Sequence, residues 1–207
     1  MINVLELPIF LVSLTNLHVG ASRETLGVVD NPFHRDSFGI VRIPGHSIKG
    51  CFRTYFEVRL EFSKKVIDAL FGNEENVGAV IFGDAYPVFI PTPTAKYGII
   101  YVSSSMLLSK LASILYREKN LKNLAEFLDK IAQYAERLNV GEALAYIDGM
   151  ENNSVSILVD VQLGLIKRDE LKTVKELINK VLEPLGTIGK YLNNGIMIVN
   201  DETYNLI

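Results

Sequence analysis

Apolar residues along this chain repeat at the spacing of strands in some segments and of helices in others. Residues 4–13 form an apolar run that predicts a buried strand. A stripe at helical spacing begins just after Pro44-Gly45 and consists of Ile48, Phe52, Tyr55, Phe56 and Leu60. The first part of the chain is therefore predicted to run strand, long loop, helix.

The middle of the chain continues with two strands and two helices. Segments 78–90 and 97–103 are rich in Val, Ile, Tyr and Phe and predict strands, whereas segments 106–118 and 121–138 have helical periodicity. The second of these helices places Leu121, Leu124, Leu128, Ile131 and Ala135 on one face. The order βαββα is the start of a ferredoxin-like (RRM-like) unit, so the predicted class is α+β.

The last third of the chain predicts a hairpin followed by further helical and strand elements. Residues 143–147 and 154–161 flank a turn rich in Asp, Gly and Asn, which is typical of a β-hairpin. No repeat, low-complexity tract or linker interrupts the sequence. We therefore expect a single domain over residues 1–207, with its main body at about 1–140, the hairpin at about 142–163 and the remaining elements at 164–207.

Composition limits the classes of function. A formal net charge of −3 argues against a protein that coats nucleic acid by bulk electrostatics. One cysteine excludes an internal disulfide and a cysteine-based zinc cluster. No apolar stretch approaches the ~20 residues of a spanning helix. The N-terminus lacks the marks of a secretory signal, so no membrane contact and a cytoplasmic location are expected.

Residues 17–53 nevertheless indicate a local site for a phosphate-bearing ligand, because glycine-containing loops lead there into a basic helix. Lys49 and Arg53 are spaced i, i+4, which puts both on one face near the helix N-terminus, where unpaired N–H groups and the helix dipole attract anions. Gly45 and Gly50 would let a phosphate backbone approach closely. The alternative is a basic face that only meets solvent.

Asp30 and His18 are the candidate catalytic side chains in this region. Asp30 precedes Asn31-Pro32, and the proline makes the segment a rigid, exposed elbow. A carboxylate there could take a proton from a nucleophile or hold a divalent metal beside a phosphodiester. His18 could contact phosphate or act as an acid. The alternatives are an aspartate that bonds its own turn and a histidine packed in the loop.

Other common chemistries have no support in the sequence. The segment 186–191 lacks the glycine spacing and the hydroxyl residue of a phosphate-binding loop of NTPases. No GxSxG motif is present, and the three histidines do not have a zinc-binding spacing.

Several motifs in order resemble the RAMP superfamily of CRISPR effector proteins, and in particular the backbone ribonuclease subunit of type III-B (Cmr) complexes, with the type III-A (Csm) subunit next. The motifs are LHVGASRETLGVVDNPFHRD, RIPGHSIKGCFRTYF, ALFGN, IFGDAYPVFIP and KYGIIYVSS. The similarity covers residues 8–105, and from residue 157 onward it rests mainly on the order of elements.

The resemblance implies a ferredoxin-like RAMP core, or palm, at about 1–140, with an inserted β-hairpin thumb at about 142–163 and additional helices. It implies that copies of the chain stack along a guide RNA and cleave complementary target RNA at regular intervals. By position in the motif, Asp30 corresponds to the acid that cleavage requires and His18 to the histidine before the glycine loop. The family's cleavage depends on Mg²⁺ or another divalent metal, for which Asp30 is the candidate ligand.

The implied partners are guide (crRNA) and target RNA, copies of the same chain and other subunits of an effector complex. The predicted RNA-contacting residues are Gly20, Arg35, Arg42, Gly45, Ser47, Lys49, Gly50 and Arg53. Family members usually continue beyond the region that matches the end of this sequence. Two alternatives therefore stay open: a non-catalytic scaffold or truncated mimic of such a complex, and an α+β protein that binds phosphate but never RNA.

Overall fold

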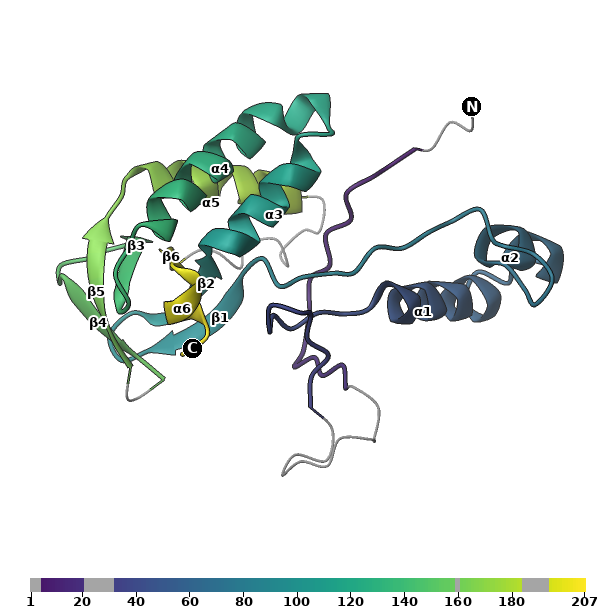
Figure 1. Cartoon of the computed structure of the whole chain (residues 1–207), viewed down its shortest axis with the longest axis horizontal. Helices are drawn as coiled ribbons and strands as arrows, with labels where there is room; N and C mark the ends of the chain where they lie inside the picture. Colours follow the sequence, from purple (N-terminus) through teal and green to yellow (C-terminus); the bar gives the residue numbers. More distant parts are fainter. Residues whose placement is uncertain (1–4, 21–31, 159–160, 184–193) are drawn as a thin grey trace. The chain divides into compact units, whose positions relative to one another are not determined.

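The computed structural model of the protein describes residues 5–20, 32–158, 161–183 and 194–207. Its contacts divide the chain into two compact units (Figure 1). The helical unit is Leu11–Pro87, and the barrel unit combines Met1–Phe10 with Val88–Ile207.

The elements of the helical unit are α1 (Gly45–Val58) and α2 (Lys64–Phe71). Those of the barrel unit are β1 (Ile90–Thr94), β2 (Gly98–Ser104), α3 (Ser105–Leu115), η1 (Lys119–Leu121), α4 (Lys122–Glu136), β3 (Glu142–Ile147), β4 (Ser154–Ile157), β5 (Val161–Lys167), α5 (Glu170–Leu182), β6 (Gly195–Val199) and α6 (Asp201–Tyr204).

The barrel unit is built on a closed, mixed β-barrel with the strand order β1-β2-β6-β3-β5-β4. β2 runs parallel to β6 and β3 runs parallel to β5, whereas the other neighbours are antiparallel. The barrel closes between β1 and β4 through the pair Thr94 and Ile157. Closure removes the free edges that an open sheet would expose.

Alternating side chains of the strands serve two separate apolar layers. In β6, Met197 and Val199 point into the barrel, while Ile196 and Ile198 face the helices. β3 shows the same division, because Ala143 lies in the barrel interior and Leu144 lies in the layer that faces the helices. This period of two is the reason that all five residues of β6 are buried.

The helices α3, α4 and α5 gather on one side of the strands (Figure 1). The predicted apolar face of α4 is confirmed, since Leu124, Leu128, Ile131 and Ala135 are buried in the core that these helices share with the sheet. The extended segment near the N-terminus joins this unit through Phe10, which packs against the same core. Two apolar layers therefore stabilise the barrel unit.

The predicted fold class is corrected in one respect. The α+β composition is confirmed, but the sheet is a six-stranded barrel and the ferredoxin-like prediction is wrong. The first predicted strand is missing from the sheet, because residues 5–13 form no strand. The strand predicted over residues 78–90 is also wrong, since only Ile90 belongs to a strand and Ala85 forms an isolated bridge.

The predicted hairpin, and with it the inserted thumb at 142–163, is wrong as well. β3 pairs with β5 and β6, and β4 pairs with β5 and β1, so β5 lies between the two strands that were expected to pair. The sequence pattern treats 154–161 as one strand, whereas β4 ends at Ile157 and Leu158 has a left-handed φ of 48°. No glycine or proline marks that break.

The helical unit contains α1, which confirms the predicted helix, and α2, which is not among the predicted elements. Four phenylalanines join the two helices and the chain that follows them. The ring of Phe56 is 5.6 Å from that of Phe71, and Phe82 lies 5.1 Å from Phe52 and 6.5 Å from Phe71 between ring centroids. Within the described ranges no helix of either unit is long and apolar enough to cross a membrane.

Candidate nucleic-acid interface

The candidate site residues that the structure describes all lie in the helical unit, beginning at the base of the loop that contains Asp30. Gly20 and Phe33 form an antiparallel bridge, and the N–H of His34 donates to the carbonyl of Val19 at 3.1 Å. The exposed His18 ring packs on Phe33 with 4.4 Å between centroids. Asp30, with its predicted catalytic and metal-binding roles, falls outside the described residues. The two ends of its loop are therefore held together, and His18 lies at this base.

A short turn beyond the loop base uses the side chains of Arg35 and Asp36. Arg35 and Val41 form an antiparallel bridge, and the Arg35 guanidinium donates to the carbonyl of Gly39. The Asp36 carboxylate accepts bonds from the N–H groups of Phe38 and Ile40 at 2.9 and 3.0 Å. Arg35, one of the predicted RNA-contacting residues, thus supports its own turn with at least one donor.

Asp84 joins the chain before α1 to the first residue of that helix. Its carboxylate accepts the N–H of Gly45 at 2.8 Å and forms an ion pair with Arg42. Ile43 and Ala85 exchange two backbone bonds of 2.9 Å beside it. The Gly45 N–H bond, assisted by the Arg42 guanidinium, holds the pKa of the Asp84 carboxyl below its ordinary value. The segment around Asp84 therefore fixes where α1 begins.

The packing of α1 against the chain at Phe82 requires a glycine at position 45. A β-carbon at this position would lie 2.1 Å from the carbonyl oxygen of Phe82, so only glycine fits. A β-carbon at Gly50 would meet nothing within 4 Å, and Gly50 is exposed. The sequence predicted that a phosphate could approach both glycines closely. At Gly45 the protein backbone occupies that space, whereas at Gly50 the space is open.

The first N–H groups of α1 are partly used inside the chain. Gly45 donates to Asp84, and the N–H of Ser47 donates to the carbonyl of Pro44 at 2.9 Å. An anion at this helix end would also meet the Asp84 carboxylate. The amides of α1 alone therefore make a weaker anion site than the sequence predicts, and the basic side chains further along the helix gain importance.

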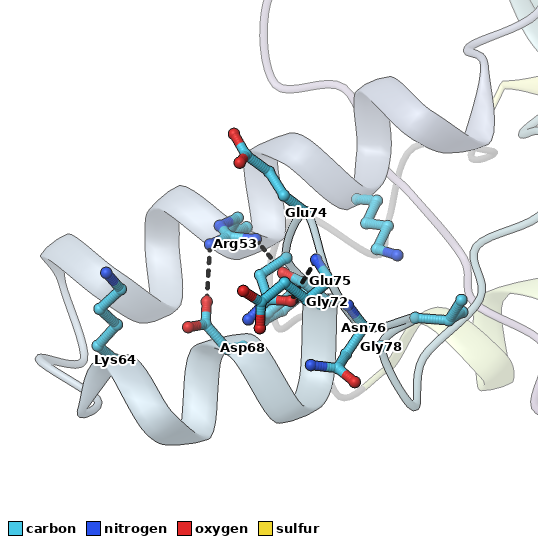
Figure 2. Close-up of a pocket in the computed structure, with 12 residues that line it drawn as sticks. Arg53, Lys64, Asp68, Gly72, Glu74, Glu75, Asn76 and Gly78 are labelled. Carbon is cyan, nitrogen blue, oxygen red and sulfur yellow. Dashed lines mark hydrogen bonds and ion pairs between the residues drawn. The ribbon is translucent and has the colours of Figure 1, made fainter.

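Lys49 and Arg53 line one open basin between α1, α2 and the loop after α2, as their spacing predicts (Figure 2). Figure 2 shows Arg53 reaching toward Asp68 on α2. Its guanidinium donates to the Asp68 carboxylate at 3.1 Å and to the carbonyl of Gly72 at 2.6 Å. Arg53 thus joins the two helices, whereas Lys49 has no ion-pair partner among the described residues.

The loop after α2 brings acidic side chains to the same basin. Its neck is tight, because a β-carbon at Gly78 would lie 2.4 Å from the N atom of Gly72. The side-chain oxygen of Asn73 accepts the N–H groups of Glu75 and Asn76 at 3.0 and 2.8 Å. Glu74 and Glu75 are therefore carried on a well-bonded turn at the basin wall.

Three residues important to this site were not singled out in the sequence: Asp68, Asp84 and Lys64. Asp84 lies in the IFGDAYPVFIP motif, and its chain distance from Gly45 gives no sign that it caps α1. Asp68 and Lys64 belong to α2, which the sequence pattern did not predict. Among the described residues no group of three or more His, Cys, Asp or Glu side chains is placed to hold a metal.

The helical unit therefore brings Lys49, Arg53 and Lys64 together around one basin. Comparison with known proteins gives the family. The model of the RAMP superfamily matches residues 10–195. The chain belongs to the RAMP superfamily.

Among curated proteins, the chain is similar to the "CRISPR system Cmr endoribonuclease Cmr4" of Pyrococcus furiosus, with 26% identity over 201 residues, which are 94% of this chain and 64% of the relative. Among solved structures, the oligomeric Cmr4 of Pyrococcus furiosus gives a TM-score of 0.64 at 22% identity, covering 84% of this chain and 65% of that one. A type III-B Cmr-beta complex bound to cognate target RNA also gives a TM-score of 0.64 at 22% identity, covering 92% of this chain and 64% of the matched chain.

These likenesses define the fold and leave part of the relatives unmatched. This chain spans 64% of the length of the curated Cmr4 relative. The similarity to solved structures shows that the chain has the fold of Cmr4-type proteins. The resemblance found in the motifs is confirmed at the level of the superfamily and of its Cmr4 members.

Proposed function

We propose that this chain is a backbone subunit of a type III CRISPR effector complex, which binds guide RNA and cleaves complementary target RNA at regular intervals. The observation that carries the proposal is the match to the Cmr endoribonuclease over 94% of this chain. The proposed partners are guide RNA, target RNA, further copies of the chain and other subunits of the complex. The cytoplasmic location expected from the sequence stays a prediction.

Asp30 is the proposed catalytic acid-base residue. Its carboxylate takes the proton from a 2′-hydroxyl of the target RNA, whose oxygen attacks the adjacent phosphorus while the bond to the 5′ oxygen breaks. His18, at the base of the same loop, gives a proton to that leaving oxygen. The ring contact between His18 and Phe33 supports this role, since it holds the imidazole beside the loop. In-line attack requires a nucleotide that is splayed out of the A-form duplex.

Dependence on Mg²⁺ or another divalent metal also stays a proposal. The described residues offer no preformed cluster of metal-binding side chains, and Asp30 is the one candidate ligand from the sequence. In this proposal, Asp30 and RNA phosphates would hold the metal together. Loss of cleavage in EDTA, restored by Mg²⁺ and not by Na⁺, is the expected result.

Guide RNA binds along α1 in this proposal. Lys49 supplies a charge for a phosphate, and Gly50 leaves open space beside it. Ser47 is half-buried and lies three residues before Gly50 in α1. Arg35, Arg42 and Gly45 shape the chain that leads to this helix, with Arg42 paired to Asp84 and Gly45 packed on the Phe82 carbonyl. Gly20 lies before the loop and is bridged to Phe33.

A non-catalytic scaffold, or a mimic of such a subunit, is the second candidate. It keeps the same fold and RNA contacts but has no turnover.

Cleavage by an assembled complex tests the proposal. Complexes are reconstituted with this chain, a guide RNA and the other subunits, and labelled complementary RNA is followed on a denaturing gel with Mg²⁺. Asp30→Asn should abolish regularly spaced products without loss of target binding. Asp36→Asn is the matched control, because it removes the same charge from a nearby aspartate whose acceptor role an amide oxygen can keep. Target binding without cleavage by any protein, the unsubstituted chain included, would favour the scaffold.

A further inference from the structure

The basin beside α1 combines both signs of charge in equal number. Its charged lining residues are Lys49, Arg53, Lys64, Asp68, Glu74 and Glu75, three positive and three negative. The sequence predicts phosphate binding at Lys49 and Arg53, but a phosphate that enters this basin also meets three carboxylates. The basin therefore attracts a polyanion far less than its basic side chains alone would.

Arg53 is already engaged by two of the basin's own oxygen atoms. It donates to the Asp68 carboxylate at 3.1 Å and to the Gly72 carbonyl at 2.6 Å. The Asp68 side chain is 19% exposed, so this pair is less screened by solvent than a surface pair would be. A phosphate can gain the charge of Arg53 only in competition with Asp68.

The acids on the loop are held at the basin wall by local structure. The Asn73 side chain bonds two N–H groups of the turn, and Asn73 N–H donates to the Asn76 carbonyl at 2.9 Å. The left-handed φ of 81° at Gly72 and the close approach of Gly78 fix the neck of the loop. Glu74 and Glu75 are exposed and cannot be carried far from the basin without breaking these bonds.

We propose that Asp68, Glu74 and Glu75 are specificity-determining residues, which keep the basic face of α1 from binding RNA unless an assembled complex adds further contacts. This inference rests on the proposed function. The acids oppose every RNA backbone equally, so they suppress the sequence-independent binding of the single chain, whereas a guide held by several neighbouring subunits overcomes the opposition.

The test measures binding of the isolated full chain to an unrelated single-stranded RNA by fluorescence anisotropy over a range of salt concentrations. Glu74→Gln with Glu75→Gln should tighten binding by about 3- to 10-fold and steepen the salt slope by about 0.7 for each phosphate gained. The backbone of the turn is organised by Asn73, so this variant should fold as the unsubstituted chain does. Asp68→Asn, which keeps an acceptor for Arg53, should act in the same direction.

The matched control is Glu57→Gln with Glu61→Gln, which removes the same charge from exposed positions that do not line the basin. An equal gain in RNA affinity in the control, or no gain in the loop variant, would overturn the proposal. Undetectable RNA binding by all of these proteins would overturn it too, since the acids would then not be what prevents binding. The same preparations are then reconstituted with guide RNA and the other subunits and assayed for guided cleavage, and absence of cleavage with the unsubstituted chain is the separate signature of a wrong function.

Discussion

Gly45 and Gly50 lie five positions apart in the same helix and have opposite surroundings. A β-carbon at Gly45 would lie 2.1 Å from the Phe82 carbonyl oxygen, and one at Gly50 would meet nothing within 4 Å. Gly45→Ala should therefore lower the free energy of unfolding by roughly 1–3 kcal/mol, as overpacking does. Gly50→Ala should raise it by up to about 1 kcal/mol through helix propensity. Urea unfolding of both variants checks this, and a stable Gly45→Ala protein would contradict the packing described.

Asp84 gives a second prediction at single-residue scale, in the pH dependence of stability. The Gly45 N–H and Arg42 lower the pKa of the Asp84 carboxyl in the folded state. The charged carboxylate therefore stabilises the fold above the ordinary pKa of the group, and this stabilisation is lost as the pH falls through the folded-state pKa. Asp84→Ala should cost about 1 kcal/mol at pH 7, the usual loss for a helix-capping carboxylate, and much less at pH 2.5. Urea unfolding at both pH values measures the difference.

The control for Asp84 is Asp84→Asn, which keeps an oxygen acceptor for the Gly45 N–H. The stability difference between this variant and the unsubstituted protein should also shrink as the pH falls, because only the charge has been removed. A difference that is constant between pH 7 and pH 2.5 would show that the Asp84 charge plays no part in holding the start of α1.

At the scale of elements, α1 separates two basic residues that look alike in sequence. Lys49 has no ion-pair partner among the described residues, while Arg53 joins α1 to α2 through Asp68 and Gly72. Lys49→Ala should weaken RNA binding by the assembled complex and leave the unfolding midpoint unchanged. Arg53→Ala should weaken RNA binding and also cost about 1 kcal/mol of stability. Equal stability of both variants in urea would contradict the bridging role of Arg53.

The helices were more predictable than the strands for a physical reason. A long amphipathic helix carries its own period, so the stripe through Ile48, Phe52 and Phe56 was enough to predict α1. A strand needs a partner that the local sequence does not specify. Residues 5–13 have the composition of a strand and form none, and Leu7 remains 66% exposed there. The eight residues of α2 were too few for a clear pattern.

At the scale of the whole molecule, the superfamily could be predicted but the sheet could not. The motifs that carry the resemblance lie in and around α1 and on either side of β1, at residues 17–36, 42–56, 69–73, 81–91 and 96–104. Chemistry and close packing restrict the residue types there. The barrel depends on β5 lying between β3 and β4, and the break at Leu158 that permits this has no glycine or proline. The acids that oppose Lys49 and Arg53 could not be foreseen without the position of α2.

The central claim is that the helical unit holds RNA along α1. The most direct test is ultraviolet crosslinking of guide RNA in an assembled complex, followed by mass spectrometry to identify the crosslinked peptides of this chain. The account predicts crosslinks within residues 44–59, which contain Lys49 and Arg53, and their loss in Lys49→Ala with Arg53→Ala. Crosslinks confined to the barrel unit, or unchanged in the double variant, would contradict it.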